Sequence, residues 1–163
     1  REIHDELGIT TLFVTHDQEE ALDLADRVVI LNEGTIVQQG TPETVCRDPK
    51  SAFVTRFLGD ANRFSAEVRG GIAYSGGASV PARGVEDGAA EVYARPGDLD
   101  WSPTGPGIAA TITRVLDRPG GRRVMAITVD SEHLEFDVEP ELAVRAGDQG
   151  FVTLRRAQVF AAE

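Results

Sequence analysis

The first part of the chain, residues 1 to about 60, alternates between helical and strand-like hydrophobic patterns. A helical pattern at Arg1–Leu7 ends at Gly8, in the position of a C-cap. A nearly continuous apolar and β-branched run, Ile9–Thr15, follows it. Such a run is typical of a strand buried on both faces of a parallel sheet, so the pattern predicts the closing half of a βαβ unit. Because the chain supplies no neighbouring strands, we expect this strand to be disordered, swapped or paired with a second copy in isolation.

A helix, a hairpin and two short helices are predicted next. Thr15-His16-Asp17-Gln18 has the form of a capping box and predicts a helix start. The runs 28–31 and 35–38 flank an Asn-Glu-Gly turn and predict a β-hairpin. Thr41 and Ser51 are N-caps for two short helices, the second of which ends at Gly59.

From about Asn62 the helical periodicity disappears and short alternating runs are separated by Gly, Pro and Asp. The hairpin of 108–117 with 122–129 is the most secure element. We therefore predict an α+β chain: residues 1–61 are the remnant of an α/β domain, and residues 62–163 form an all-β barrel or sandwich. The predicted strands are Phe64–Val68, Gly71–Ser75, Ala90–Tyr93, Gly107–Leu116, Arg123–Val129, Glu135–Val138, Asp148–Thr153 and Gln158–Phe160.

Composition narrows the classes of partner. The formal net charge of -11 argues against binding to a nucleic-acid backbone, which depends on Lys and Arg. No apolar stretch approaches the roughly 20 residues of a membrane-spanning helix. The single cysteine excludes an internal disulfide and fits a reducing, cytosolic setting. The chain begins inside an amphipathic segment, as if cut within a domain.

His16 is the main candidate for chemistry, because a buried strand would deliver it to the C-terminal edge of a sheet, just before a helix. Ligands of open α/β sheets bind at that edge, and an imidazole there can donate a hydrogen bond to a phosphate oxygen. On the residues around it alone, a structural histidine remains the commoner alternative.

The string Val14-Thr15-His16-Asp17-Gln18-Glu19-Glu20-Ala21 resembles the switch loop of an ABC transporter ATPase domain. Ala25-Asp26-Arg27, Asn32-Glu33-Gly34 and Gly40-Thr41-Pro42 follow at that family's spacing. The resemblance implies a P-loop ATPase remnant in which His16 contacts the γ-phosphate of ATP and helps to position the attacking water. It implies ATP and Mg²⁺ as cofactors of the full-length subunit. The chain has no G-x-x-x-x-G-K-S/T phosphate loop, so we expect this fragment to bind no cofactor and to be inactive.

The second part resembles the OB-like accessory domain of ABC importers, through Arg95-Pro96-Gly97-Asp98-Leu99 and Gly147-Asp148. Asn62-Arg63 is most similar to the sulfate/thiosulfate group. The resemblance implies an ATPase that couples hydrolysis to sulfate or thiosulfate uptake, peripheral to the cytoplasmic face of the inner membrane. Its partners would be a second copy of itself and transmembrane permease subunits. Molybdate, iron, polyamine or sugar import is the alternative within the family.

Two functions of the β-rich part compete. It can be a structural and regulatory domain that pairs with its twin, or an anion sensor that uses Arg95, Arg122 and Arg123. The first is favoured, because Arg122 and Arg123 lie beside a Gly-Gly turn opposite Arg118, a pattern typical of an exposed hairpin tip. The rival interpretation of the whole chain is a stand-alone oxyanion-sensing β-barrel.

Two further patterns concern the predicted barrel. Trp101 is predicted to be a half-buried core residue. Four carboxylates spaced by two residues predict one solvated face rather than a metal site. They are Glu135, Asp137, Glu139 and Glu141.

Overall fold

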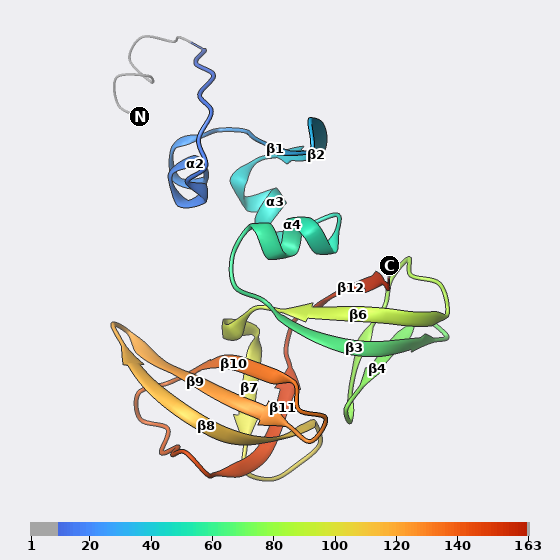
Figure 1. Cartoon of the computed structure of the whole chain (residues 1–163), viewed down its shortest axis with the longest axis vertical. Helices are drawn as coiled ribbons and strands as arrows, with labels where there is room; N and C mark the ends of the chain where they lie inside the picture. Colours follow the sequence, from blue (N-terminus) through green and yellow to red (C-terminus); the bar gives the residue numbers. More distant parts are fainter. Residues whose placement is uncertain (1–9, 163) are drawn as a thin grey trace. The chain divides into compact units, whose positions relative to one another are not determined.

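The computed structural model describes residues 10–162, which divide into two compact units. Unit 1 runs to Leu58 and unit 2 starts at Gly59. Each is described by itself below, with the elements labelled as in Figure 1. The helix predicted at Arg1–Leu7 lies outside the described residues.

The described part of unit 1, residues 10–58, holds a two-stranded antiparallel hairpin and three short helices around a small apolar cluster. Its elements are α2 (Gln18–Leu24), β1 (Val28–Asn32), β2 (Thr35–Gly40), α3 (Pro42–Arg47) and α4 (Ala52–Phe57). Ile30, Val45 and Val54 are the buried residues of the cluster. Thr41 and Ser51 cap α3 and α4 as predicted, each accepting from the backbone N–H three residues on. The hairpin and both short helices are thus confirmed.

The start of α2 is confirmed, but its N-cap is not the predicted one. Asp17 caps this helix through Oδ1, which accepts from the N–H of Glu20 at 3.0 Å. Thr15 lies two residues earlier, and its Oγ1 accepts from the N–H of Asp17 at 3.0 Å. The carboxylate takes the cap because it also complements the positive end of the helix dipole.

The strand predicted at Ile9–Thr15 does not form over its described residues, 10–15. Leu12 and Val14 are 89% and 88% exposed. A strand buried on both faces requires partner strands at its edges and apolar cover above and below. Within the described part of unit 1 the only sheet is β1–β2, so the run stays extended and unpaired. The remnant of a P-loop ATPase domain is therefore not visible as a parallel sheet.

Unit 2 is built from two five-stranded antiparallel sheets (Figure 1). The first sheet has the order β12-β6-β3-β4-β5, and the second has the order β10-β9-β8-β11-β7. The first comprises β3 (Asn62–Arg69), β4 (Ile72–Ser75), β5 (Ala78–Pro81), β6 (Gly88–Ala94) and β12 (Gln158–Ala161). The second comprises β7 (Leu99–Ser102), β8 (Ile108–Arg118), β9 (Gly121–Thr128), β10 (His133–Val138) and β11 (Gln149–Leu154). A short 3₁₀ turn, η1 (Pro96–Asp98), leads from β6 into β7.

One apolar core lies between the two sheets and takes side chains from both. Phe64 and Val92 come from the first sheet, and Phe136 and Val152 from the second; all four are 0% exposed. Trp101 of β7 stacks on Phe136 of β10 with ring centroids 5.6 Å apart. Because β7 and β10 are opposite edges of the second sheet, this contact curls the sheet toward a barrel. The all-β prediction and the half-buried Trp101 are confirmed.

The secure hairpin is confirmed as β8–β9, which pair from Ala110↔Thr128 to Arg118↔Gly121. Gly120, with φ +84°, provides its left-handed turn residue. The sequence patterns missed β5 and β7. β5 ends in a proline, and β7 follows a 3₁₀ turn and contains two polar residues among its four, so neither gives a strand pattern.

Candidate functional site

His16 lies at an exposed bend directly before Asp17, the N-cap of α2. Its side chain makes no hydrogen bond or ion pair with any residue between 10 and 162. Asp17, Glu19 and Glu20 surround the start of the seven-residue helix, whose N–H of Glu20 is already bonded to Asp17. In the isolated chain, these negative charges disfavour the binding of a phosphate beside His16. His16 is thus accessible for a phosphate contact but has no supporting donors in the described residues.

Neither a cluster of metal-ligating side chains nor a phosphate loop is present in residues 10–162. Within residues 10–162, no group of three His, Cys, Asp or Glu side chains is placed to hold a metal ion. The phosphate loop motif that would supply backbone N–H groups and a lysine is absent from the sequence. The helices of the described range are too short, or too polar, for one to cross a bilayer.

Arg95 is the first of the three arginines considered as anion donors. It directly follows β6 and precedes Pro96, which favours the extended backbone observed at Arg95, φ -69° and ψ 150°. Its Nη1 donates to two successive backbone carbonyls, those of Gly59 at 2.6 Å and Asp60 at 3.0 Å. This guanidinium therefore binds the chain itself at the beginning of unit 2.

Arg123 is enclosed by carboxylates. Its side chain is only 11% exposed, and it contacts Asp137 at 2.5 Å, Glu135 at 3.1 Å and Asp60 at 3.6 Å. The pair with Asp137 is bidentate, through Nε and Nη2. The hydrogen bond to Asp137 and the further bond to Glu135 raise the pKa of Arg123, although burial opposes this. The expectation of an exposed hairpin tip is wrong for this residue, because the carboxylates of β10 cover it.

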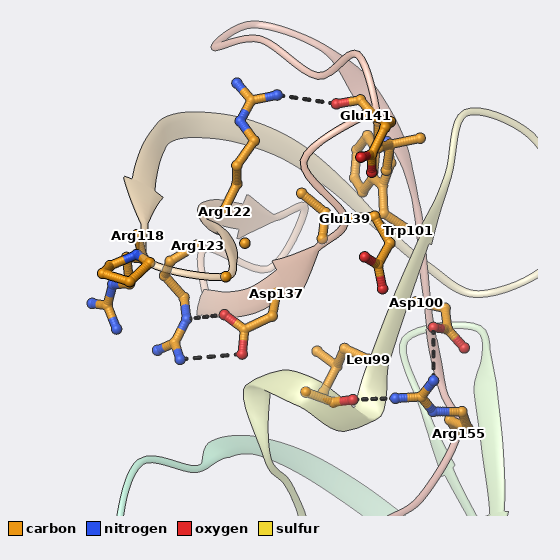
Figure 2. A pocket seen from close by; sticks show the side chains of 16 residues that line it. Leu99, Asp100, Trp101, Arg118, Arg122, Arg123, Asp137, Glu139, Glu141 and Arg155 are labelled. Atoms are coloured by element: carbon orange, nitrogen blue, oxygen red, sulfur yellow. Dashed lines mark hydrogen bonds and ion pairs between the residues drawn. The ribbon is translucent and has the colours of Figure 1, made fainter.

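Arg122 points away from its neighbour, as successive residues of a strand do (Figure 2). Its Nε donates to Asp117 at 3.1 Å, and its Nη1 donates to the carbonyl of Leu142 at 3.0 Å. The structure therefore does not bring the three arginines together at one point.

A groove of about 770 Å³ runs beside Arg122 and Arg123 (Figure 2). Arg155 contributes to it and is paired with Asp100 at 3.6 Å and with the carbonyl of Gly97. The charged residues of its lining are Arg118, Arg122, Arg123, Arg155, Asp100, Asp137, Glu139 and Glu141. Four positive and four negative side chains leave no excess of positive charge to attract an anion.

Asn62 joins the two sheets of unit 2, a role that its place in the sequence did not indicate. It is 6% exposed at the start of β3. Its Nδ2 donates to the carbonyls of Ala94 (3.3 Å) and Glu135 (2.7 Å), and its Oδ1 accepts from the N–H of Glu135 (2.7 Å). The amide thus occupies the free edge of β10 as a partner strand would. No local sequence signal could have found this role, because its partner Glu135 lies 73 positions further along the chain.

No protein-family model matches the chain. Curated relatives match nearly all of it. A protein of Agrobacterium fabrum named sulfate/thiosulfate import ATP-binding protein CysA 2 is 63% identical over 161 residues, covering 98% of this chain and 47% of the relative. Proteins named sulfate/thiosulfate import ATP-binding protein CysA from Caulobacter vibrioides and Bacillus cereus are 44% and 38% identical. They cover 99% and 100% of the chain, and 47% and 49% of their own length is matched.

A solved structure shows the fold of the β-rich part. The cytoplasmic molybdate-binding protein ModG, with molybdate bound, matches with a TM-score of 0.51 and 11% identity, covering 62% of this chain and 96% of that one. At this identity the likeness concerns the fold alone, and it supports the predicted OB-like character. The chain spans about half the length of the curated relatives it matches. The resemblance found in the sequence is confirmed: this chain is homologous, over almost its whole length, to the C-terminal part of bacterial sulfate/thiosulfate import ATP-binding proteins.

Proposed function

We propose that this chain is the C-terminal part of the ATP-binding subunit of an ABC importer that couples ATP hydrolysis to the uptake of sulfate or thiosulfate. The observation that carries the proposal is the 63% identity to a relative of that name over 98% of the chain. The subunit would act as a homodimer on permease subunits at the cytoplasmic face of the membrane, with ATP and Mg²⁺ as cofactors.

His16 is the residue that we assign to hydrolysis within the complete subunit. Its exposure, and its lack of partners among residues 10–162, leave the imidazole available to a γ-phosphate brought by another part of the protein. There it would donate a hydrogen bond and orient the attacking water, which raises the rate without contributing much to nucleotide affinity. The chain alone, which lacks the phosphate loop, should neither bind nor hydrolyse ATP.

A chimera tests both parts of the proposal. The C-terminal part of the Agrobacterium relative is replaced by this chain, and the chimera is produced in a strain that lacks the relative. We expect uptake of labelled sulfate to be restored, and purified complexes to hydrolyse ATP. His16→Ala should lower hydrolysis about 100-fold or more while ATP still binds. The matched control is His133→Ala, which changes an exposed histidine of unit 2 and should leave the rate unchanged.

Two results would contradict the proposal. Hydrolysis by the His16→Ala chimera at the parental rate would remove the role of His16. A folded chimera that restores uptake of molybdate or a sugar, but not of sulfate, would reject the substrate.

For unit 2 we propose a structural and regulatory role, in which it pairs with its counterpart in the homodimer. The internal acceptors that occupy Arg95, Arg122 and Arg123 support this role. Anion sensing through these arginines stays a prediction. Calorimetric titration of the chain with millimolar sulfate, thiosulfate and molybdate tests it, since saturable heat would favour the sensor.

A further inference from the structure

The segment that leads into unit 2 is Gly59–Asp60–Ala61, named the connector here. It follows the end of α4 and precedes β3. Gly59 has φ +126°, a backbone conformation that residues with a side chain rarely adopt, so the chain turns at a defined point. Two successive carbonyls of the connector, those of Gly59 and Asp60, face the same guanidinium nitrogen of Arg95. One cation that holds two neighbouring carbonyls fixes the peptide plane between them.

The side chain of Asp60 attaches the connector at a second place. Asp60 contacts Nη1 of Arg123 at 3.6 Å, and the same nitrogen is bonded to Glu135 at 3.1 Å. Arg123 is itself held by its bidentate contact with Asp137. Its guanidinium therefore gives Asp60 a cation that is held in place, because it cannot leave the carboxylates of β10 without breaking two further ion pairs.

The residue after the connector gives the third attachment. Asn62 is bonded to the backbone of β10 and to the end of β6. The connector is thus held from β6, β9 and β10 within four consecutive residues. A flexible tether between domains is usually rich in Gly, Ser or Pro and makes no such contacts.

We propose that the connector is a fixed anchor, in which Arg95 and Arg123 act as positioning residues that set where and in which direction the chain enters unit 2. Arg95 holds the backbone and Arg123 holds the side chain of Asp60. If the proposed function holds, this anchor fixes the first residues of unit 2 that follow the ATPase part in the complete subunit.

Nitrogen-15 relaxation of the labelled 163-residue chain tests the anchor, because it measures the motion of each amide. We expect order parameters of about 0.8 or more for the connector amides, close to those of the strands. Arg95→Met removes the donors but keeps the apolar stem, and it should lower the connector values below about 0.6 while the strands stay rigid. The matched control is Arg118→Met at the exposed end of β8, which should change nothing in the connector.

A milder variant guards against loss of the fold. Asp60→Asn removes one carboxylate whose side chain is 78% exposed, and it leaves the Arg123–Asp137 pair intact. The substitution should lower the order parameters of the amides at positions 60 and 61 more than that of the Gly59 amide. Connector amides already below about 0.6 in the unchanged chain would overturn the proposal. Connector amides that keep order parameters of about 0.8 in both Arg95→Met and Asp60→Asn would also overturn it. Neither outcome depends on whether the complete subunit transports sulfate.

Discussion

Replacement of Asn62 by alanine tests how the two sheets of unit 2 are joined. The substitution deletes three hydrogen bonds of 2.7, 2.7 and 3.3 Å from a side chain that is 6% exposed. It leaves the N–H and the carbonyl of Glu135 without their partner. Removing the partner of one buried polar group costs about 1–3 kcal/mol. Since the edge of β10 is partly open to water, we expect a loss of about 2–4 kcal/mol rather than the full sum.

Urea unfolding followed by tryptophan fluorescence measures this loss. Trp101 is the single tryptophan of the chain and stacks on Phe136, so its emission reports on unit 2. The midpoint should fall while the slope stays the same, as for a change in stability alone. The control is Ser65→Ala, on the exposed face of the same strand, which should lie within about 0.5 kcal/mol of the parent. A loss for Asn62→Ala no larger than that of the control would refute the joining role.

Two further substitutions probe the core and one close backbone contact of unit 2. Phe136→Ala empties a fully buried position and should cost about 3–5 kcal/mol in urea unfolding, with Trp101 emission moving to longer wavelength as its stacking partner is lost. Unchanged emission would mean that the stack does not exist in solution. Gly107→Ala would put Cβ 2.6 Å from the carbonyl oxygen of Val152 at φ +140°, so the thermal midpoint of unit 2 should fall by several degrees in circular dichroism. A midpoint equal to that of the parent would show that β8 and β11 can separate at no cost.

The β8–β9 hairpin was predictable because its information is local. Two long alternating runs flank Arg118-Pro119-Gly120-Gly121, and only a glycine adopts the φ of +84° at Gly120 easily. The short strand β7 was not predictable in this way. Its four residues include the exposed Asp100, and it is a strand because β11 pairs with it across about fifty residues of chain. Its pairing is a property of the folded unit.

The unpaired run at Thr10–Val14 separates local preference from tertiary context. Its β-branched and apolar residues carry a strand pattern, yet Leu12 and Val14 are almost fully exposed. Backbone hydrogen bonds of a strand come from its neighbours, so propensity alone does not form one.

The arginines show most clearly what sequence could and could not decide. Alternation along β9 already separates Arg122 from Arg123, since successive side chains of a strand point to opposite faces. The pairing of β9 with β10 places Asp137 opposite Arg123. Glu135 lies two residues along on the same face, as the spacing of those carboxylates predicted. Asp60 could not be foreseen, because it lies 63 positions earlier and meets Arg123 only through the fold.

That third carboxylate changes what Arg123 can do. A guanidinium binds an external anion when its donors exceed the acceptors that the protein already offers. Arg123 has Asp60, Glu135 and Asp137 within 3.6 Å, and the negative charge of these three carboxylates opposes the approach of an external anion. The ion pairs that oppose an anion here include the one that, in our proposal, fastens the connector. Anion binding at Arg123 and the attachment of Asp60 therefore compete for the same guanidinium.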